Sequence, residues 1–241
     1  MKYIKEYNEY VDPFNEEDWD EVEPPKPDGT FLTWLKIRHP DEDTWKDIKN
    51  INCDEEELTN LIGIEKLINL EKLVCHYNQL TELDVSKNIK LMHLHCHYNQ
   101  LTELNLNIKL KNLCCYNNQL TELDLSKNIN LEKLYYHHNQ LRELDVTKNI
   151  KLEFLNCHHN ELTELDVSNN INLRVLLCNN NQLRELDISK NIKITELCCY
   201  NNQLTELDVT KNIKLIELGC SSNQLTELDL SKNIKLKYKN I

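Results

Sequence analysis

Histidines and tyrosines that alternate along short apolar segments are the side chains in this sequence with the clearest capacity for chemistry. His93, His95 and His97 occupy every second position of one segment, and Tyr135 and His137 do so in another. Neutral imidazole binds transition metals, and its charge changes near a pH of about 6.5. Clustered aromatic rings instead favour contacts with a protein partner. Whether these side chains are placed to bind a metal ion or to contact a protein partner depends on the elements that carry them.

A repeated motif positions these side chains. It reads L-x-x-L-x-C-x-x-N-x-L-T-E-L-D-V-S-K-N-I-x, is 21 residues long, and occurs eight times over residues 70–235, with one copy two residues shorter. A short period predicts a solenoid, in which each repeat forms one coil that contacts its neighbours. A partial copy covers residues 236–241. The full copies begin at Leu70, Leu91, Leu110, Leu131, Leu152, Leu173, Ile194 and Leu215.

Each repeat consists of two halves in which apolar residues alternate. Leu73 and Cys75 are two residues apart, so in an extended segment both point to one face, while Val74 and His76 point to the other. We therefore expect parallel β-strands stacked in a flattened coil, with few helices and extended segments on both sides. The inward positions of the first repeat are expected to be Leu70, Leu73, Cys75, Leu80, Leu83, Val85 and Ile89.

The motif resembles the leucine-rich repeat, and within that superfamily it is similar to the two-half IRREKO class of bacterial and large-DNA-virus proteins. The resemblance covers residues 48–241. The unit over 48–69 is more similar to the SDS22-like class, with Glu56 where asparagine is expected. The resemblance implies a leucine-rich-repeat solenoid that forms a right-handed coil or a shallow horseshoe.

Residues 1–47 have a different composition from the array. They contain all three tryptophans and all five prolines of the chain. We predict an acidic tail over 1–29 and an N-terminal cap over 30–47, which covers the open apolar face of the first coil. The covering side chains are expected to be Phe31, Trp34, Leu35, Ile37 and Trp45.

Cysteines and asparagines form two further columns along the array. We interpret the cysteines as small buried hydrophobic residues in a reducing compartment. Cys114 and Cys198 precede members of the column and are expected to be outward-facing, exposed thiols. Asparagines equivalent to Asn78 and Asn88 are assigned to bonding turn backbone. The cysteine column comprises Cys75, Cys96, Cys115, Cys157, Cys178, Cys199 and Cys220, with Tyr136 in the fourth repeat.

The second half of each repeat carries an acidic stripe. Glu82, Asp84 and their equivalents recur along the array, and the formal net charge is -12. This charge argues against nucleic-acid binding, which requires a basic surface. Because we find neither a membrane-spanning apolar stretch nor a signal peptide, we expect no membrane association and a cytoplasmic location, in the host cytoplasm if the protein is a viral or bacterial effector.

At the outward positions of the first half, the residue changes from repeat to repeat and is often histidine, tyrosine or phenylalanine. In leucine-rich-repeat proteins the equivalent strand positions line the concave surface, where the family usually binds proteins. The resemblance therefore implies a non-catalytic scaffold for protein–protein interaction, with a partner of unknown identity. The predicted partner-binding residues are His93, His95, His97, Tyr98, Tyr116, Tyr135, His137, Phe154 and His158.

Enzymatic and metal-dependent functions find little support in the sequence. It has no glycine-rich phosphate loop and no recognisable nucleophile motif, so we predict no catalytic residue and no cofactor. The row His93, His95 and His97 lacks an acidic or cysteine ligand, and alternation spaces its side chains by nearly 7 Å, so we assign no metal ligand.

Two alternatives stay open: a histidine-based metal-binding or pH-responsive binder, and an effector that engages a basic host protein through its acidic tail or stripe. The oligomeric state is also left open.

Overall fold

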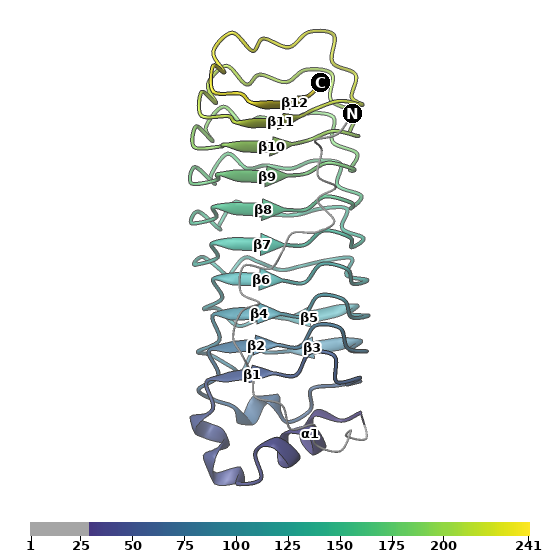
Figure 1. Cartoon of the computed structure of the whole chain (residues 1–241), viewed down its shortest axis with the longest axis vertical. Helices are drawn as coiled ribbons and strands as arrows, with labels where there is room; N and C mark the ends of the chain where they lie inside the picture. Colours follow the sequence, from purple (N-terminus) through teal and green to yellow (C-terminus); the bar gives the residue numbers. More distant parts are fainter. Residues whose placement is uncertain (1–28) are drawn as a thin grey trace.

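The protein is a parallel β-solenoid. A computed structural model describes residues 29–241, so the predicted acidic tail lies outside the described residues except for Gly29. Short parallel strands are stacked one above another along the long axis, and a helical segment precedes the stack (Figure 1). The expected solenoid of parallel strands with few helices is confirmed.

The first halves of the repeats form one ten-stranded parallel sheet. Its order is β1-β2-β4-β6-β7-β8-β9-β10-β11-β12, so the sheet follows the chain with one strand per coil (Figure 1). Its strands are β1 (Asn50–Asn52), β2 (Lys72–Val74), β4 (His93–His95), β6 (Asn112–Cys114), β7 (Lys133–Tyr135), β8 (Phe154–Asn156), β9 (Val175–Leu177), β10 (Glu196–Cys198), β11 (Glu217–Gly219) and β12 (Tyr238–Asn240).

The register of the sheet places equivalent residues of successive repeats side by side. Leu73 pairs with Leu94, and Leu134 pairs with Leu155. In the second halves, the described residues form one strand pair, β3 (Glu82–Asp84) with β5 (Glu103–Asn105). Later second halves follow the same course without a strand ladder. The columns predicted in the first half of the repeat are therefore columns in space.

Leucines and cysteines fill the interior between the two sides of the coil. Leu73, Leu94 and Cys75 have no exposed surface. One predicted inward position is wrong, because Ile89 is 57% exposed while the preceding Asn88 is completely buried. The amide of Asn88 donates to the backbone oxygens of Ile64 and Leu67 in the preceding coil. Asn88 therefore lies in the interior instead of Ile89, because buried carbonyls of the preceding coil need its amide as a hydrogen-bond donor.

A second column of asparagines connects adjacent coils at the end of the sheet. In the Asn181 side chain, Oδ1 accepts from the backbone N–H of Leu162 at 3.0 Å. Its Nδ2 donates to the backbone oxygens of Cys157 at 3.1 Å and Cys178 at 3.0 Å. One side chain thereby satisfies three buried backbone groups from two coils. Equivalent bonds occur at Asn78, Asn99, Asn118, Asn139, Asn160, Asn202 and Asn223.

The segment before the array is helical. It contains α1 (Phe31–Arg38) and the 3-10 helix η1 (Glu42–Asp47), and a second 3-10 helix, η2 (Ile64–Lys66), lies in the first coil. Phe31, Trp34, Leu35 and Trp45 are buried in the same hydrophobic cluster as Leu73, whereas Ile37, which was expected to join them, is 38% exposed. Within residues 29–241, no helix is long and apolar enough to cross a bilayer.

The asparagine column predicts a position-specific loss of stability. Asn181→Ala leaves the N–H of Leu162 and one or more carbonyls buried without a partner, so the free energy of unfolding should fall by about 1–3 kcal/mol or more. Gln182→Ala, at the neighbouring exposed position, should change it by less than about 0.5 kcal/mol. Chemical denaturation of both variants measures this difference. Equal losses would contradict the structural assignment of the column.

Candidate functional site

Two columns of polar and aromatic side chains run beside the carboxyl ends of the sheet strands. The inner column follows the interior cysteines and comprises His76, His97, Tyr116, His137, His158, Asn179, Tyr200 and Ser221. The outer column is one residue further along and comprises Tyr77, Tyr98, Asn117, His138, His159, Asn180, Asn201 and Ser222. Each member lies beside its equivalent in the next coil because the strands pair in register.

Rings of the inner column contact one another over five consecutive coils, stacked in the two middle pairs and tilted by 34° and 32° in the first and last pairs. The ring centroids are 4.4 Å apart for His76 and His97, and 4.3 Å apart for His97 and Tyr116. The series continues at 4.1 Å between Tyr116 and His137 and at 4.5 Å between His137 and His158. These spacings are close to the distance of about 4.8 Å between neighbouring strands. The sheet thus sets the stacking.

The outer column has a left-handed backbone conformation. Each of its eight residues has a positive φ, for example 52° at His138 and 50° at His159. Asparagine and histidine tolerate this conformation better than most residues do. The ring centroids of His138 and His159 are 4.3 Å apart and nearly parallel. Tyr77 and Tyr98 stack in the same way at 4.4 Å and are 48% and 39% exposed.

The solvent side of the sheet carries a second apolar cluster. Tyr135 and Phe154 stack with their ring centroids 4.4 Å apart, and Leu177 extends the cluster on the next strand. Cys114 and Cys198 also belong to it and are buried, so the expectation of exposed thiols at these positions is wrong. Large neighbours on the same face of the sheet contact these cysteines. Burial also raises the pKa of Cys198 to about 12.

The thiols of the interior cysteine column are unreactive. Cys53 extends it by one coil, since β1 pairs with β2 in the register that aligns Cys53 with Cys75. Burial raises the pKa of Cys157 to about 12 and that of Cys220 to about 11. A thiol with such a pKa stays protonated and is a poor nucleophile. The column therefore serves packing.

Buried histidines of the inner column are held in the neutral form. Burial, together with the neighbouring His158, lowers the pKa of His137 to about 2. Burial and the neighbouring His159 and His138 lower the pKa of His158 to about 3. Burial also lowers the pKa of the outer-column His138 and His159. Neutral imidazole is the form that binds metal ions.

His158 has an unusual environment for a buried polar group. Its side chain is 4% exposed, and among residues 29–241 neither of its ring nitrogens has a hydrogen-bond partner. A buried polar atom without a partner costs about 1–3 kcal/mol. Such atoms are rare in native structures, and a bound ion or water that completes the bonding is one explanation for them.

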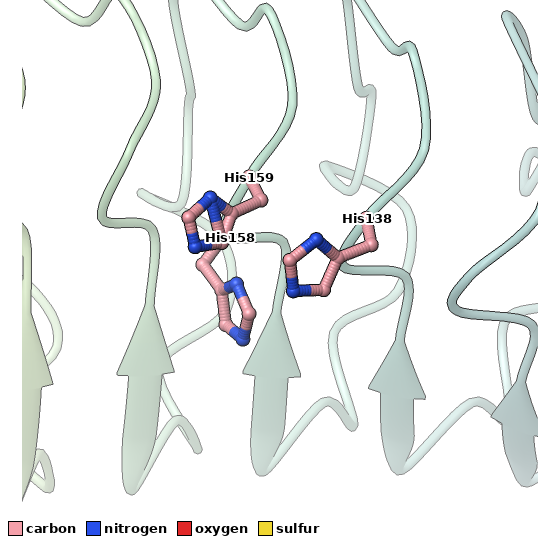
Figure 2. Close-up of side chains that lie close together, drawn as sticks. All are labelled: His138, His158 and His159. Carbon is pink, nitrogen blue, oxygen red and sulfur yellow. The ribbon is translucent and has the colours of Figure 1, made fainter. Parts of the chain in front are cut away.

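The described residues contain one group of three metal-capable side chains, His138, His158 and His159. One ring nitrogen from each lies within 4.8 Å of the other two. Figure 2 shows these imidazoles gathered beyond the ends of neighbouring strands, with His138 on one coil and the other two on the next. The row His93, His95 and His97 does not form such a group.

The predicted partner-binding residues divide among three places. His97, Tyr98, Tyr116, His137 and His158 lie in the ring columns, and Tyr135 and Phe154 lie in the apolar cluster. His93 and His95 lie on β4, where the Nδ2 of Asn112 lies 3.0 Å from the Nδ1 of His93. The sequence prediction omitted His138 and His159 from the site. The available signal was a His-His pair repeated at a spacing of 21 residues, at 137–138 and 158–159.

Comparisons with known proteins identify relatives by structure. No protein-family model and no curated protein matches the sequence. The functional domain of InlJ from Listeria monocytogenes, whose structure includes a cysteine ladder, is 38% identical with a TM-score of 0.69, and the match covers 82% of this chain and 49% of that one. A leucine-rich-repeat protein from Leptospira interrogans is 26% identical with a TM-score of 0.76, covering 81% and 55%. YopM from Yersinia enterocolitica is 26% identical with a TM-score of 0.63, covering 89% and 51%.

The solenoid, its repeated leucines and these matches together define a leucine-rich-repeat protein. The chain spans about half the length of the three structures.

The depressed pKa values predict a loss of stability in mild acid. Histidine in the unfolded chain has a pKa of about 6.5, so below this pH the unfolded state binds more protons than the folded state. The free energy of unfolding should therefore fall as the pH decreases from 6.5 toward the folded values of about 2 and about 3. The slope should approach about 1.4 kcal/mol per pH unit for each histidine.

Denaturation at several pH values between about 6.5 and 5.5 measures this slope, above most of the range in which carboxylates titrate. The matched variant is His137→Asn with His158→Asn, since Asn179 occupies the same column. It should have a shallower slope than the native protein. Identical slopes would mean that these rings do not carry the acid sensitivity.

Proposed function

We propose that this protein is a non-catalytic scaffold for protein–protein interaction whose partner binds the first-half strand face and the adjoining ring columns. The observation that carries the proposal is the contrast between the two sides of the coil. The second half repeats the same glutamate and aspartate from coil to coil, whereas the first half changes side chains at each step. A surface whose side chains change from coil to coil offers the specific contacts that discriminate one partner from others.

The composition of the first-half face fits protein recognition. Tyr77 and Tyr98 present stacked phenol rings that are 48% and 39% exposed, and stacking fixes their orientation before a partner binds. Tyrosine supplies a large contact area and a polar hydroxyl, and it is enriched among residues that dominate binding energy. The similarity to other leucine-rich-repeat proteins also supports a scaffold.

No catalytic role is part of this proposal. The thiols that could act as nucleophiles have raised pKa values because they are buried, as at Cys157 and Cys198. Because the ten cysteines are packed as small buried side chains, we extend the proposal to a reducing compartment and hence to a cytoplasmic location.

The acidic stripe offers a second candidate surface. Its glutamates and aspartates are exposed, and hydrogen bonds from Ser168 lower the pKa of Asp166, with the same arrangement at equivalent aspartates. The stripe thus stays negatively charged at neutral pH. In this alternative, a basic partner would bind the second-half face.

Two matched variants distinguish the surfaces. The strand-face variant is His95→Asn with Tyr98→Asn and Tyr135→Asn, all of which place asparagine where another coil of the array already has it. The stripe variant is Glu164→Gln with Glu185→Gln and Glu206→Gln. Both sets of changes leave the leucine, cysteine and asparagine columns intact, and melting curves confirm that each variant is folded.

Capture from host-cell lysates with the native protein identifies partners, and the dissociation constant is then measured for each variant. The strand-face variant should bind the partner at least about tenfold more weakly, a loss of about 1.4 kcal/mol. The stripe variant should bind like the native protein. If only the stripe variant loses the partner, recognition lies on the acidic face and the strand-face proposal is wrong.

A further inference from the structure

We propose that His138, His158 and His159 form a binding site for one divalent transition-metal ion. The site involves three imidazoles from two adjacent coils, each with one ring nitrogen within 4.8 Å of the others (Figure 2). This inference does not depend on the partner-binding proposal, because it concerns a ligand held by the turn beyond the sheet.

The ring orientations suit convergence on one ion. His138 and His159 stack at 4.3 Å, and the ring of His158 stands at 88° to His138 and 77° to His159, with centroid distances of 5.1 Å and 5.0 Å. Two nitrogens bound to the same zinc ion at about 2.0–2.1 Å are about 3.4 Å apart in a tetrahedral site. The nitrogens, which lie within 4.8 Å of one another, must approach to about 3.4 Å to bind one zinc ion. Small side-chain rotations of His138 and His159 allow this approach, because the first side chain is half-buried and the second exposed, so both have room to turn.

His158 supplies the independent indication of a ligand. Its ring is buried, and both of its nitrogens lack hydrogen-bond partners among residues 29–241. Coordination of one nitrogen to a metal ion would satisfy a polar atom that is otherwise buried without a partner. The ring also contacts that of His137, with centroids 4.5 Å apart and planes tilted by 32°, so its position is held by the inner column.

The chemistry of the three ligands selects the kind of ion. Imidazole prefers zinc, copper, nickel and iron, whereas magnesium and calcium prefer oxygen ligands. No carboxylate or thiol joins the group within residues 29–241, so three protein ligands are present and solvent completes the coordination at the exposed side of His159. The Nδ2 of Asn180 lies 3.3 Å from Nε2 of His159. When Nδ1 of His159 binds the metal, Nε2 carries the proton, so a turn of the Asn180 amide that presents Oδ1 would let it accept this proton and hold the ring.

The array itself provides variants that should preserve the fold. Asn117, Asn180 and Asn201 occupy the positions equivalent to His138 and His159 with the same positive φ, and Asn179 occupies the position equivalent to His158. The site variants are therefore His138→Asn with His159→Asn, and His158→Asn alone. The control is His76→Asn, which removes a histidine from the inner column four coils before His158.

The test is isothermal titration calorimetry of tag-free, full-length protein with Zn²⁺ alone, with Mg²⁺ as the negative control. The native protein and the His76→Asn control should bind one zinc ion per chain with a dissociation constant in the micromolar range or below. Both site variants should bind at least about tenfold more weakly, since even loss of an outer-shell partner of a metal ligand typically has that effect. Circular dichroism establishes that each variant is folded. The variant with both His138→Asn and His159→Asn retains the buried ring of His158, so its loss of binding would not result from a change in the inner column.

Three results would overturn the proposal. The first is the absence of zinc binding by the native protein in this concentration range. The second is unchanged binding by the double variant at His138 and His159. The third is an equal loss of binding in the His76→Asn control, which would place the ion elsewhere in the inner column.

Discussion

The structure depends on the need to satisfy buried backbone groups where the chain turns from one half of the coil to the other. In each coil an asparagine amide, such as Asn181, accepts from one backbone N–H and donates to carbonyls of two coils. The buried asparagines of the second half, such as Asn170, bond carbonyls of the preceding coil at 2.9 Å. Leaving these groups unpaired would cost about 1–3 kcal/mol each, so the repeat keeps asparagine at both positions.

This constraint fixes the register, and the register determines what each surface can do. A side chain at a given position of the repeat meets its own equivalent about 4.8 Å away on each side. Stacked rings such as Tyr116 and His137 attract, with a gain of about 0.5–1.5 kcal/mol per aromatic pair beyond burial. Stacked carboxylates repel and must stay solvated, which is why the acidic side is exposed while the ring columns are compact and partly buried.

The sequence predicted the parts of the fold that are governed by period. The 21-residue spacing and the two-residue alternation of Leu73 and Cys75 led to the parallel solenoid and its interior columns. Ile89 was misplaced because an apolar residue next to an asparagine was taken as the buried one, whereas the unpaired carbonyls of the preceding coil require the Asn88 amide inside. Cys114 and Cys198 were misplaced because alternation gives the direction of a side chain and not the size of its neighbours on the same face.

The histidine cluster was missed for a different reason. Strand alternation predicts that consecutive residues such as His158 and His159 point to opposite sides. Beyond β8 the backbone turns, and His159 has a φ of 50°, so both rings approach His138 of the preceding coil. The partner-binding positions, in contrast, were predicted through resemblance to leucine-rich repeats and from side-chain variation, neither of which identifies a partner.

Amide hydrogen exchange tests the central claim, that asparagine side chains joining adjacent coils hold the array together. The backbone N–H groups of Leu101, Leu120, Leu141, Leu162 and Leu183 donate to such side chains and to no sheet partner. If the account is right, these amides exchange as slowly as those of the sheet strands, since both open only when coils separate. Exchange of these leucine amides at the rate of an unstructured chain, while the strands stay protected, would contradict it.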